Sequence, residues 1–123
     1  MDKLRILVVE DDQSFCLVIS RWLKESEVKL TSNVGEALEF VKKEKFDLAI
    51  VDYKLDGNET GIDFLRKIKE EKIDLPVIII SGYTKKFGGQ LIYDECINLG
   101  CKKYLEKAFN KEDLLKTIKE CLN

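Results

Sequence analysis

Short apolar segments alternate with segments of helical periodicity along the whole chain. Buried strands of a parallel sheet have continuous apolar runs, because both of their faces are covered. The segment 28–31 instead alternates polar and apolar residues, which suits an edge strand. The predicted strands are residues 4–9, 28–31, 46–51, 77–80 and 103–105.

Between these strands, apolar residues recur at the i, i+3, i+4 and i+7 spacing of an amphipathic helix. Asp11 or Asp12 is the N-cap of the first helix, the third begins at about Gly61, and the fourth, which is weaker, ends at Gly100. Residues 83–90 are predicted as a loop. The apolar helix positions are Phe15, Val18, Ile19, Trp22 and Leu23; Val34, Ala37, Leu38 and Val41; Ile62, Leu65 and Ile68; Leu91, Ile92, Cys96 and Leu99; and Leu114, Leu115, Ile118, Cys121 and Leu122.

This alternation predicts an α/β fold, in which right-handed crossovers place helices on both faces of a parallel sheet. A length of 123 residues predicts one domain, covering residues 1–123. The formal charge of −2 argues against nucleic acid as a primary partner. No apolar run approaches the roughly 20 residues that span a bilayer. Since the chain passes from Met1 directly into a strand, we expect no signal peptide, no membrane partner and a cytoplasmic location.

The cysteine and histidine content excludes several kinds of metal site and catalytic site. The chain has 4 cysteines without a C-x-x-C pair or a zinc spacing, and Cys16 and Cys121 lie in helical patterns. We therefore interpret the thiols as structural. The chain has 0 histidines, which excludes Ser-His and Cys-His nucleophile pairs.

Polar residues stand at the carboxyl ends of four predicted strands: Glu10 and Asp11, Asp52, Ser81, and Lys107. In a parallel sheet these ends share one edge, so the groups converge if the first, third, fourth and fifth strands are neighbours. Each has an ordinary explanation alone, as a helix cap, a turn former, a backbone-bonded hydroxyl or a surface lysine. Their joint occurrence at four strand ends favours a site.

The chemistry of such a site follows from its charges. Three carboxylates in one cleft repel one another, and a divalent cation such as Mg²⁺, which prefers oxygen ligands, removes the repulsion. The cation, a lysine and a hydroxyl then form an electropositive cradle for a phosphoryl group. A carboxylate in that cradle can attack phosphorus and form an acyl phosphate.

These residues resemble a known family. The chain is similar over its whole length to a receiver domain of a bacterial two-component response regulator, of the single-domain, chemotaxis-regulator-like kind. The resemblance implies a flavodoxin-like (βα)5 three-layer sandwich with strand order 2-1-3-4-5. The matching motifs are residues 6–12 (ILVVEDD), 35–38 (GEAL), 46–52 (FDLAIVD), 76–83 (PVIIISGY) and 104–107 (YLEK).

By this resemblance Asp52 is the phosphoacceptor. Asp11 binds Mg²⁺ (or Mn²⁺) directly, Glu10 binds it mostly through water, and the backbone carbonyl of Lys54 completes the protein ligands together with Asp52.

The resemblance also implies the parts that transmit the signal. Ser81 bonds a phosphoryl oxygen, Lys107 pairs with the acceptor and its phosphoryl group, and Tyr104 is the aromatic switch residue. The implied donor is a sensor histidine kinase or a phosphotransfer protein. The implied output is a downstream protein target at the face formed by the fourth helix, the last strand and the last helix. We expect a monomer or a weak phosphorylation-linked dimer, and no enzyme activity beyond self-catalysed aspartyl phosphorylation and dephosphorylation.

The chain departs from the family pattern after the lysine, where a proline, commonly with a cis bond, is usual and Ala108 is present. A cis bond to a non-proline residue costs roughly 3–4 kcal/mol. We therefore expect the Lys107–Ala108 bond to be either trans with a shifted lysine or a retained, strained cis bond.

Two loops also depart from the pattern. The loop after Asp52 is one residue longer than usual and has Asp56 at the usual proline position, and the segment from Ser81 to Lys107 is longer and contains residues 88–89 (GG). Lys54 and Tyr83 flank the route by which water attacks the acyl phosphate in this family, so we expect slow self-dephosphorylation.

The residues near Asp52 do not fit two other functions of similar folds or chemistry. A phosphatase of the haloacid-dehalogenase type needs an acid two residues after its nucleophile, where this chain has Lys54, and a flavin-binding module needs a phosphate loop where this chain has acids. The main alternative is a degenerate receiver that acts as an unphosphorylated scaffold. The chain either acts alone or is part of a longer regulator.

Overall fold

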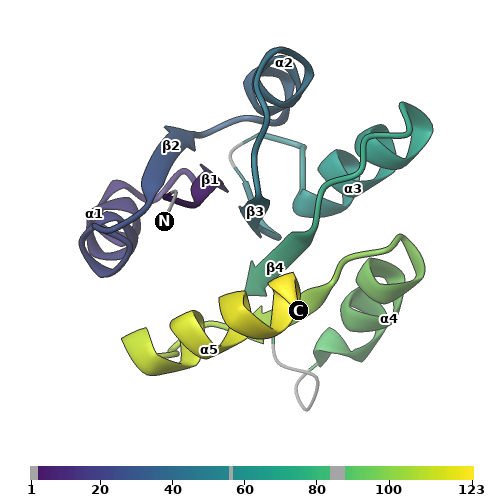
Figure 1. Cartoon of the computed structure of the whole chain (residues 1–123). Helices are drawn as coiled ribbons and strands as arrows, with labels where there is room; N and C mark the ends of the chain where they lie inside the picture. The colour runs from purple at the N-terminus through teal and green to yellow at the C-terminus, as the bar shows by residue number, and fades with distance from the viewer. Residues whose placement is uncertain (1–2, 56, 84–87) are drawn as a thin grey trace.

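The computed structural model of the chain describes residues 3–55, 57–83 and 88–123. Strands and helices alternate through these residues (Figure 1). The elements are β1 (Arg5–Val9), α1 (Gln13–Trp22), β2 (Glu27–Thr31), α2 (Val34–Lys43), β3 (Leu48–Asp52), α3 (Gly61–Glu70), β4 (Val77–Ser81), α4 (Gln90–Asn98), β5 (Lys103–Glu106) and α5 (Lys111–Leu122).

The strands form one parallel sheet in the order β2-β1-β3-β4-β5. This confirms the predicted α/β class and the flavodoxin-like order 2-1-3-4-5. The register aligns the carboxyl ends of the central strands, since Val9 lies beside Val51, Asp52 beside Ile80, and Ser81 beside Glu106. The edge where the candidate residues were expected to converge is therefore real.

Each apolar strand run contributes to two cores, because successive side chains point to opposite faces. In β1, Leu7 and Val9 pack with α2, α3 and α4, while Ile6 and Val8 pack with α1 and α5. Figure 1 shows the same arrangement, with α1 and α5 on one side of the sheet and the other helices opposite. The continuous apolar runs thus result from burial on both faces.

The helix ends follow local hydrogen bonding. Asp12, rather than Asp11, is the N-cap of α1, and its carboxylate accepts a hydrogen bond from the Phe15 backbone N–H at 3.2 Å. Helix α3 begins at Gly61 as predicted, after a capping box between Thr60 and Asp63. The loop predicted for residues 83–90 is wrong at its end, because Gln90 already belongs to α4. Residues 84–87 lie outside the described residues, as does Asp56.

Gly100 ends α4 as predicted. It has a φ of 94°, in the left-handed region that glycine adopts without strain, and its N–H bonds the carbonyl of Ile97 at 3.0 Å. The N–H of Cys101 bonds the carbonyl of Cys96 at 3.0 Å, which completes a Schellman motif. Both thiols are buried and free, as is that of Cys121, in agreement with their interpretation as structural groups.

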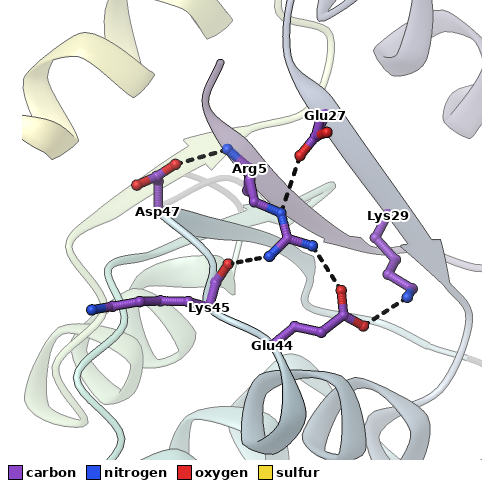
Figure 2. Close-up of polar contacts among 6 residues, drawn as sticks. All are labelled: Arg5, Glu27, Lys29, Glu44, Lys45 and Asp47. Atoms are coloured by element: carbon purple, nitrogen blue, oxygen red, sulfur yellow. Dashed lines mark hydrogen bonds and ion pairs between the residues drawn. The ribbon is translucent and has the colours of Figure 1, made fainter. Parts of the chain in front are cut away.

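A polar network that the sequence analysis missed ties the opposite, amino edge of the sheet (Figure 2). The Arg5 guanidinium donates to Glu27 at 3.1 Å, to Glu44 at 2.7 Å and to the carbonyl of Lys45 at 2.7 Å. The network joins β1 to β2 and to the connection between α2 and β3. Its members are Arg5, Glu27, Lys29, Glu44, Lys45 and Asp47.

The structure also bears on membrane insertion. Among the helices of the described residues, none has both the length and the apolar character of a membrane-spanning helix.

Gly61 permits α3 to start against the end of β3. A Cβ atom at this position would lie 2.9 Å from the backbone oxygen of Asp52 and 3.1 Å from Ile79. We therefore predict that Gly61→Ala lowers the free energy of unfolding by about 1–3 kcal/mol, as other overpacked sites do. Urea denaturation measures the change.

The matched control is Gly35→Ala, also in the first turn of a helix, where an added Cβ would meet only an ordinary contact at 3.7 Å. This variant should gain up to about 1 kcal/mol, because alanine restricts the unfolded chain. A Gly61→Ala protein as stable as wild type would contradict the prediction.

Candidate functional site

The carboxyl edge of the sheet brings the candidate residues together. Asp52 is the last residue of β3 and Ser81 the last of β4, while Glu10 and Lys107 directly follow β1 and β5. These four strands are neighbours, so their ends surround one point. Glu10, Asp52 and Ser81 are buried at 2%, 4% and 1% exposure, which is unusual for charged and polar side chains.

Three acids form a candidate metal site. Glu10, Asp11 and Asp52 each offer a carboxylate oxygen, and these oxygens lie within 4.8 Å of one another. Asp11 is partly exposed, and its backbone N–H donates to the Glu10 carboxylate at 3.1 Å. A set made only of carboxylate oxygens fits a hard cation such as Mg²⁺.

Lys107 neutralises the two buried acids. Its Nζ lies 3.1 Å from Asp52 Oδ2 and 3.3 Å from Glu10 Oε1. Burial alone lowers the pKa of Lys107, but the hydrogen bond and the charge of Asp52, followed by those of Glu10, raise it above its ordinary value. The lysine is therefore held as a cation between the carboxylates.

In Glu10 the effects that favour the neutral form outweigh the effect of Lys107. Burial, followed by the hydrogen bond and the charge of Asp52, raises the pKa of Glu10 to about 8, although Lys107 opposes the shift. Without a divalent cation Glu10 thus binds a proton more tightly than an isolated glutamate does, as expected for a buried acid beside a like charge.

The turn after Lys107 differs from both expected alternatives. Among the described residues there is no cis peptide bond, so the Lys107–Ala108 bond is trans, yet Lys107 is not shifted away from Asp52. The physical reason is the conformation of Ala108, whose φ of 74° lies in the left-handed region and redirects the chain. Proline is therefore not required to place this lysine.

Ser81 and Tyr104 both contact Tyr83. The Ser81 hydroxyl oxygen accepts a hydrogen bond from the Tyr83 backbone N–H at 2.9 Å, and the Tyr104 hydroxyl donates to the Tyr83 carbonyl at 2.7 Å. The Tyr104 ring also packs edge-to-face on Tyr93 of α4, with 5.4 Å between centroids. The two residues expected to form the switch are thus joined through one backbone segment. Their roles stay predictions.

Lys54 and Tyr83 lie where the sequence analysis expected them. Both line a pocket of about 330 Å³ at Asp52, together with Asp11 and Lys107. Tyr83 is 41% exposed and packs edge-to-face on Tyr53 at 5.8 Å. The proposed role of the Lys54 carbonyl as a metal ligand stays a prediction.

Sequence reasoning missed one neighbour of the site. Phe15, assigned only to the apolar face of α1, lies with its ring 5.0 Å from the Nζ of Lys107. Its position three residues after the cap Asp12 is the one signal that placed it near the acidic edge.

The fold and the site together define a class: a doubly wound α/β domain with clustered acids, a hydroxyl and a lysine at the carboxyl edge. The chain belongs to the family of response regulator receiver domains, whose family model matches residues 6–119. This confirms the resemblance found from the motifs and assigns the chain to two-component signalling.

Individual relatives agree with this assignment. The chain is 32% identical over 122 residues to a putative response regulator NtrX-like of Rickettsia felis, covering 97% of this chain and 25% of that protein. The chain thus spans about a quarter of the length of such curated relatives.

Two solved structures share the fold. A CheY-like response regulator receiver domain protein from Methanospirillum hungatei is 30% identical, with a TM-score of 0.87 and coverage of 98% of this chain and 94% of that one. The receiver domain of sensor histidine kinase PA1611 from Pseudomonas aeruginosa is 22% identical, with a TM-score of 0.84 and coverage of 98% of both chains; it has a magnesium ion coordinated in its active site cleft.

The raised pKa of Glu10 predicts a pH dependence of stability in the metal-free protein. Between about 4.5 and about 8 the folded protein holds a proton that the unfolded chain releases. Since the unfolded state then binds fewer protons, the free energy of unfolding falls as pH rises through this window. Urea denaturation in the presence of a chelator measures it.

The control is Glu10→Gln, which keeps a side chain of similar shape but has no carboxyl to titrate. Its stability should fall less steeply over the same pH range, while the contributions of all other groups are shared with wild type. Equal slopes for the two proteins would show that Glu10 titrates normally.

Proposed function

We propose that the protein is a phosphorylation-dependent switch that accepts a phosphoryl group on Asp52. The donor is a partner histidine kinase or a phosphotransfer protein, and the reaction requires Mg²⁺. The observation that carries the proposal is the buried Asp52 carboxylate, placed 3.1 Å from the Lys107 ammonium and within the cluster of three acids.

The acceptor chemistry is nucleophilic. An oxygen of the Asp52 carboxylate attacks phosphorus, the bond between phosphorus and the donor's leaving group breaks, and the leaving group keeps the electron pair. The product is a mixed anhydride on Asp52. The pocket of about 330 Å³ at this carboxylate leaves it open to a donor.

Glu10, Asp11, Asp52 and the backbone carbonyl of Lys54 would hold Mg²⁺ (or Mn²⁺). The oxygen-only donor set supports this choice, and the fold relative PA1611 has magnesium in its own cleft. When bound, the cation neutralises charge on the acids and on the transferring group. Lys107 supplies the second positive charge, because its ammonium already lies at Asp52.

Ser81 connects the site to the surface. Its hydroxyl lies at the adjacent strand end and donates a hydrogen bond to a phosphoryl oxygen on Asp52. If the Ser81 side chain rotates to make this bond, the bond that it now accepts from the Tyr83 N–H changes as well, and the Tyr83 carbonyl is the acceptor of the Tyr104 hydroxyl. The phosphoryl group thus biases the position of Tyr104.

The output is a change of the α4-β5-α5 face, which binds a downstream protein target. Exposed apolar side chains on α4 and α5 support the assignment: Leu91 and Ile97 on α4 are 81% and 41% exposed, and Leu115 on α5 is 42% exposed. We propose a cytoplasmic protein that acts through protein contacts, without direct nucleic acid or membrane binding, as a monomer or a weak phosphorylation-linked dimer. It catalyses only its own phosphorylation and dephosphorylation.

Phosphorylation is tested with a small donor. Incubation with Mg²⁺ and acetyl phosphate should add one phosphoryl group per chain, detected by intact-protein mass spectrometry, and Asp52→Asn should abolish the addition. Asp47→Asn is the matched control, because Asp47 lies one residue before the opposite end of the same strand and should not affect labelling. An unmodified wild-type protein would favour the scaffold alternative.

The lifetime of the phosphoryl group tests the pocket lining. Lys54 and Tyr83 both line the pocket at Asp52, so their side chains restrict the in-line approach of water. Tyr83→Ala should therefore shorten the half-life of the acyl phosphate several-fold after the donor is removed, followed by mass spectrometry. Tyr83→Phe, which keeps the ring at the same position, is the control. An unchanged lifetime in Tyr83→Ala would refute the blocking role.

A further inference from the structure

Lys107 has a contact beyond its two carboxylates. Its Nζ lies over the face of the Phe15 ring, 5.0 Å from the ring centroid. An ammonium at this distance is attracted by the negative face of an aromatic ring. The side chain of Lys107 is 32% exposed, so a contact that holds it near Asp52 competes directly with solvation of the ammonium.

Both the backbone and the ring of Phe15 have fixed contacts. The backbone N–H of Phe15 donates a hydrogen bond to the capping carboxylate of Asp12 at 3.2 Å, which anchors the residue in the first turn of α1. Its ring meets Phe109 edge-to-face, with 5.8 Å between centroids and 88° between planes. Phe109 in turn packs on Trp22, the one tryptophan of the chain, at 6.1 Å.

These rings also anchor the turn that carries the lysine. Ala108 has a φ of 74°, which is strained for a non-glycine residue and persists only when its surroundings impose it. The next residue, Phe109, packs against the core shared by α1 and α5 together with Phe15 and Trp22. The aromatic cluster therefore lies on both sides of Lys107: it fixes the backbone that follows, and Phe15 contacts the ammonium.

We propose that Phe15 is a positioning residue for Lys107, which holds the ammonium over the Asp52 carboxylate through the face of its ring. This takes the place of the constraint that a proline at position 108 would supply. The contact itself does not depend on the proposed function, but its effect on phosphorylation does.

The contact is tested first on the wild-type protein without metal or donor. The ring current of Phe15 should shift the ε-methylene proton resonances of Lys107 upfield in a two-dimensional NMR spectrum. Phe15→Leu should return them towards the positions of a solvated lysine, whereas Phe15→Tyr, which keeps the ring, should retain the shift. Unshifted Lys107 resonances in wild type would overturn the proposal, whatever the outcome of the phosphorylation experiment.

The effect of this contact on phosphorylation is tested by the phosphorylation rates of variants and by their affinity for Mg²⁺. With acetyl phosphate and Mg²⁺, Phe15→Leu should be phosphorylated about fivefold more slowly than wild type, within the range that a cation–π contact supports. Phe15→Tyr should restore the rate. A small donor avoids any effect of α1 on docking of a protein partner.

Binding of Mg²⁺ separates positioning from loss of structure. Lys107 and the cation are attracted to the same carboxylates, so release of the lysine should leave Phe15→Leu with an Mg²⁺ affinity equal to or above that of wild type. Local unfolding would lower both the affinity and the rate. Ile19→Val removes packing from the same core and the same helix at a residue that has no role in the proposal, and it should keep the wild-type rate.

The outcomes are distinct. A slow Phe15→Leu protein with weakened Mg²⁺ binding, or an Ile19→Val protein that is equally slow, would reduce Phe15 to a packing residue and overturn the proposal. If wild type accepts no phosphoryl group at all, the proposed function fails, and the NMR result alone decides whether Phe15 positions Lys107.

Discussion

The structure depends on holding two buried carboxylates beside one ammonium. Removing an ion from water costs several kcal/mol even after relaxation, and two acids in contact add their repulsion. Glu10 and Asp52 are buried because their strands are central in the sheet, and the fold compensates them with Lys107 from the end of β5. All buried polar side-chain atoms of the described residues have a hydrogen-bond partner, but one ammonium balances only part of the charge of two carboxylates. A divalent cation would balance the rest.

The sheet register, Gly61 and the Arg5 network all help to position the two buried carboxylates. The parallel register sets the height of Asp52 against Ser81, and Gly61 brings the start of α3 to the backbone of Asp52. The Arg5 network ties the opposite edge of the sheet, so the strands that carry the acids are held at both ends. Exposed ion pairs of this kind each contribute little, and the value of the network lies in joining three segments.

Much of this was accessible from the sequence, because strand burial and strand ends leave clear patterns. The apolar runs before Glu10, Asp52 and Ser81 identified the central strands, and parallel topology brought their ends together. The contact of Phe15 with Lys107 and the left-handed Ala108 were not accessible, since a helical pattern marks Phe15 only as apolar and alanine carries no signal for a positive φ. Local patterns report burial and periodicity, whereas these features arise from the packing of distant segments.

The connection from the site to the surface also depends on contacts between distant segments, which local sequence patterns do not show. Tyr83 is bonded through its N–H to Ser81 and through its carbonyl to Tyr104, so one peptide segment belongs to both. On the proposed function, we expect the Ser81 side chain to rotate towards a phosphoryl group and to weaken the hydrogen bond from the Tyr83 N–H. A shift of this segment would move the acceptor of the Tyr104 hydroxyl. Through the ring contact of Tyr104 with Tyr93, the shift would also change the packing of α4. On this proposal the signal depends on backbone hydrogen bonds that the identity of residue 83 does not specify, and the side chain at that position has the separate proposed role of limiting the access of water.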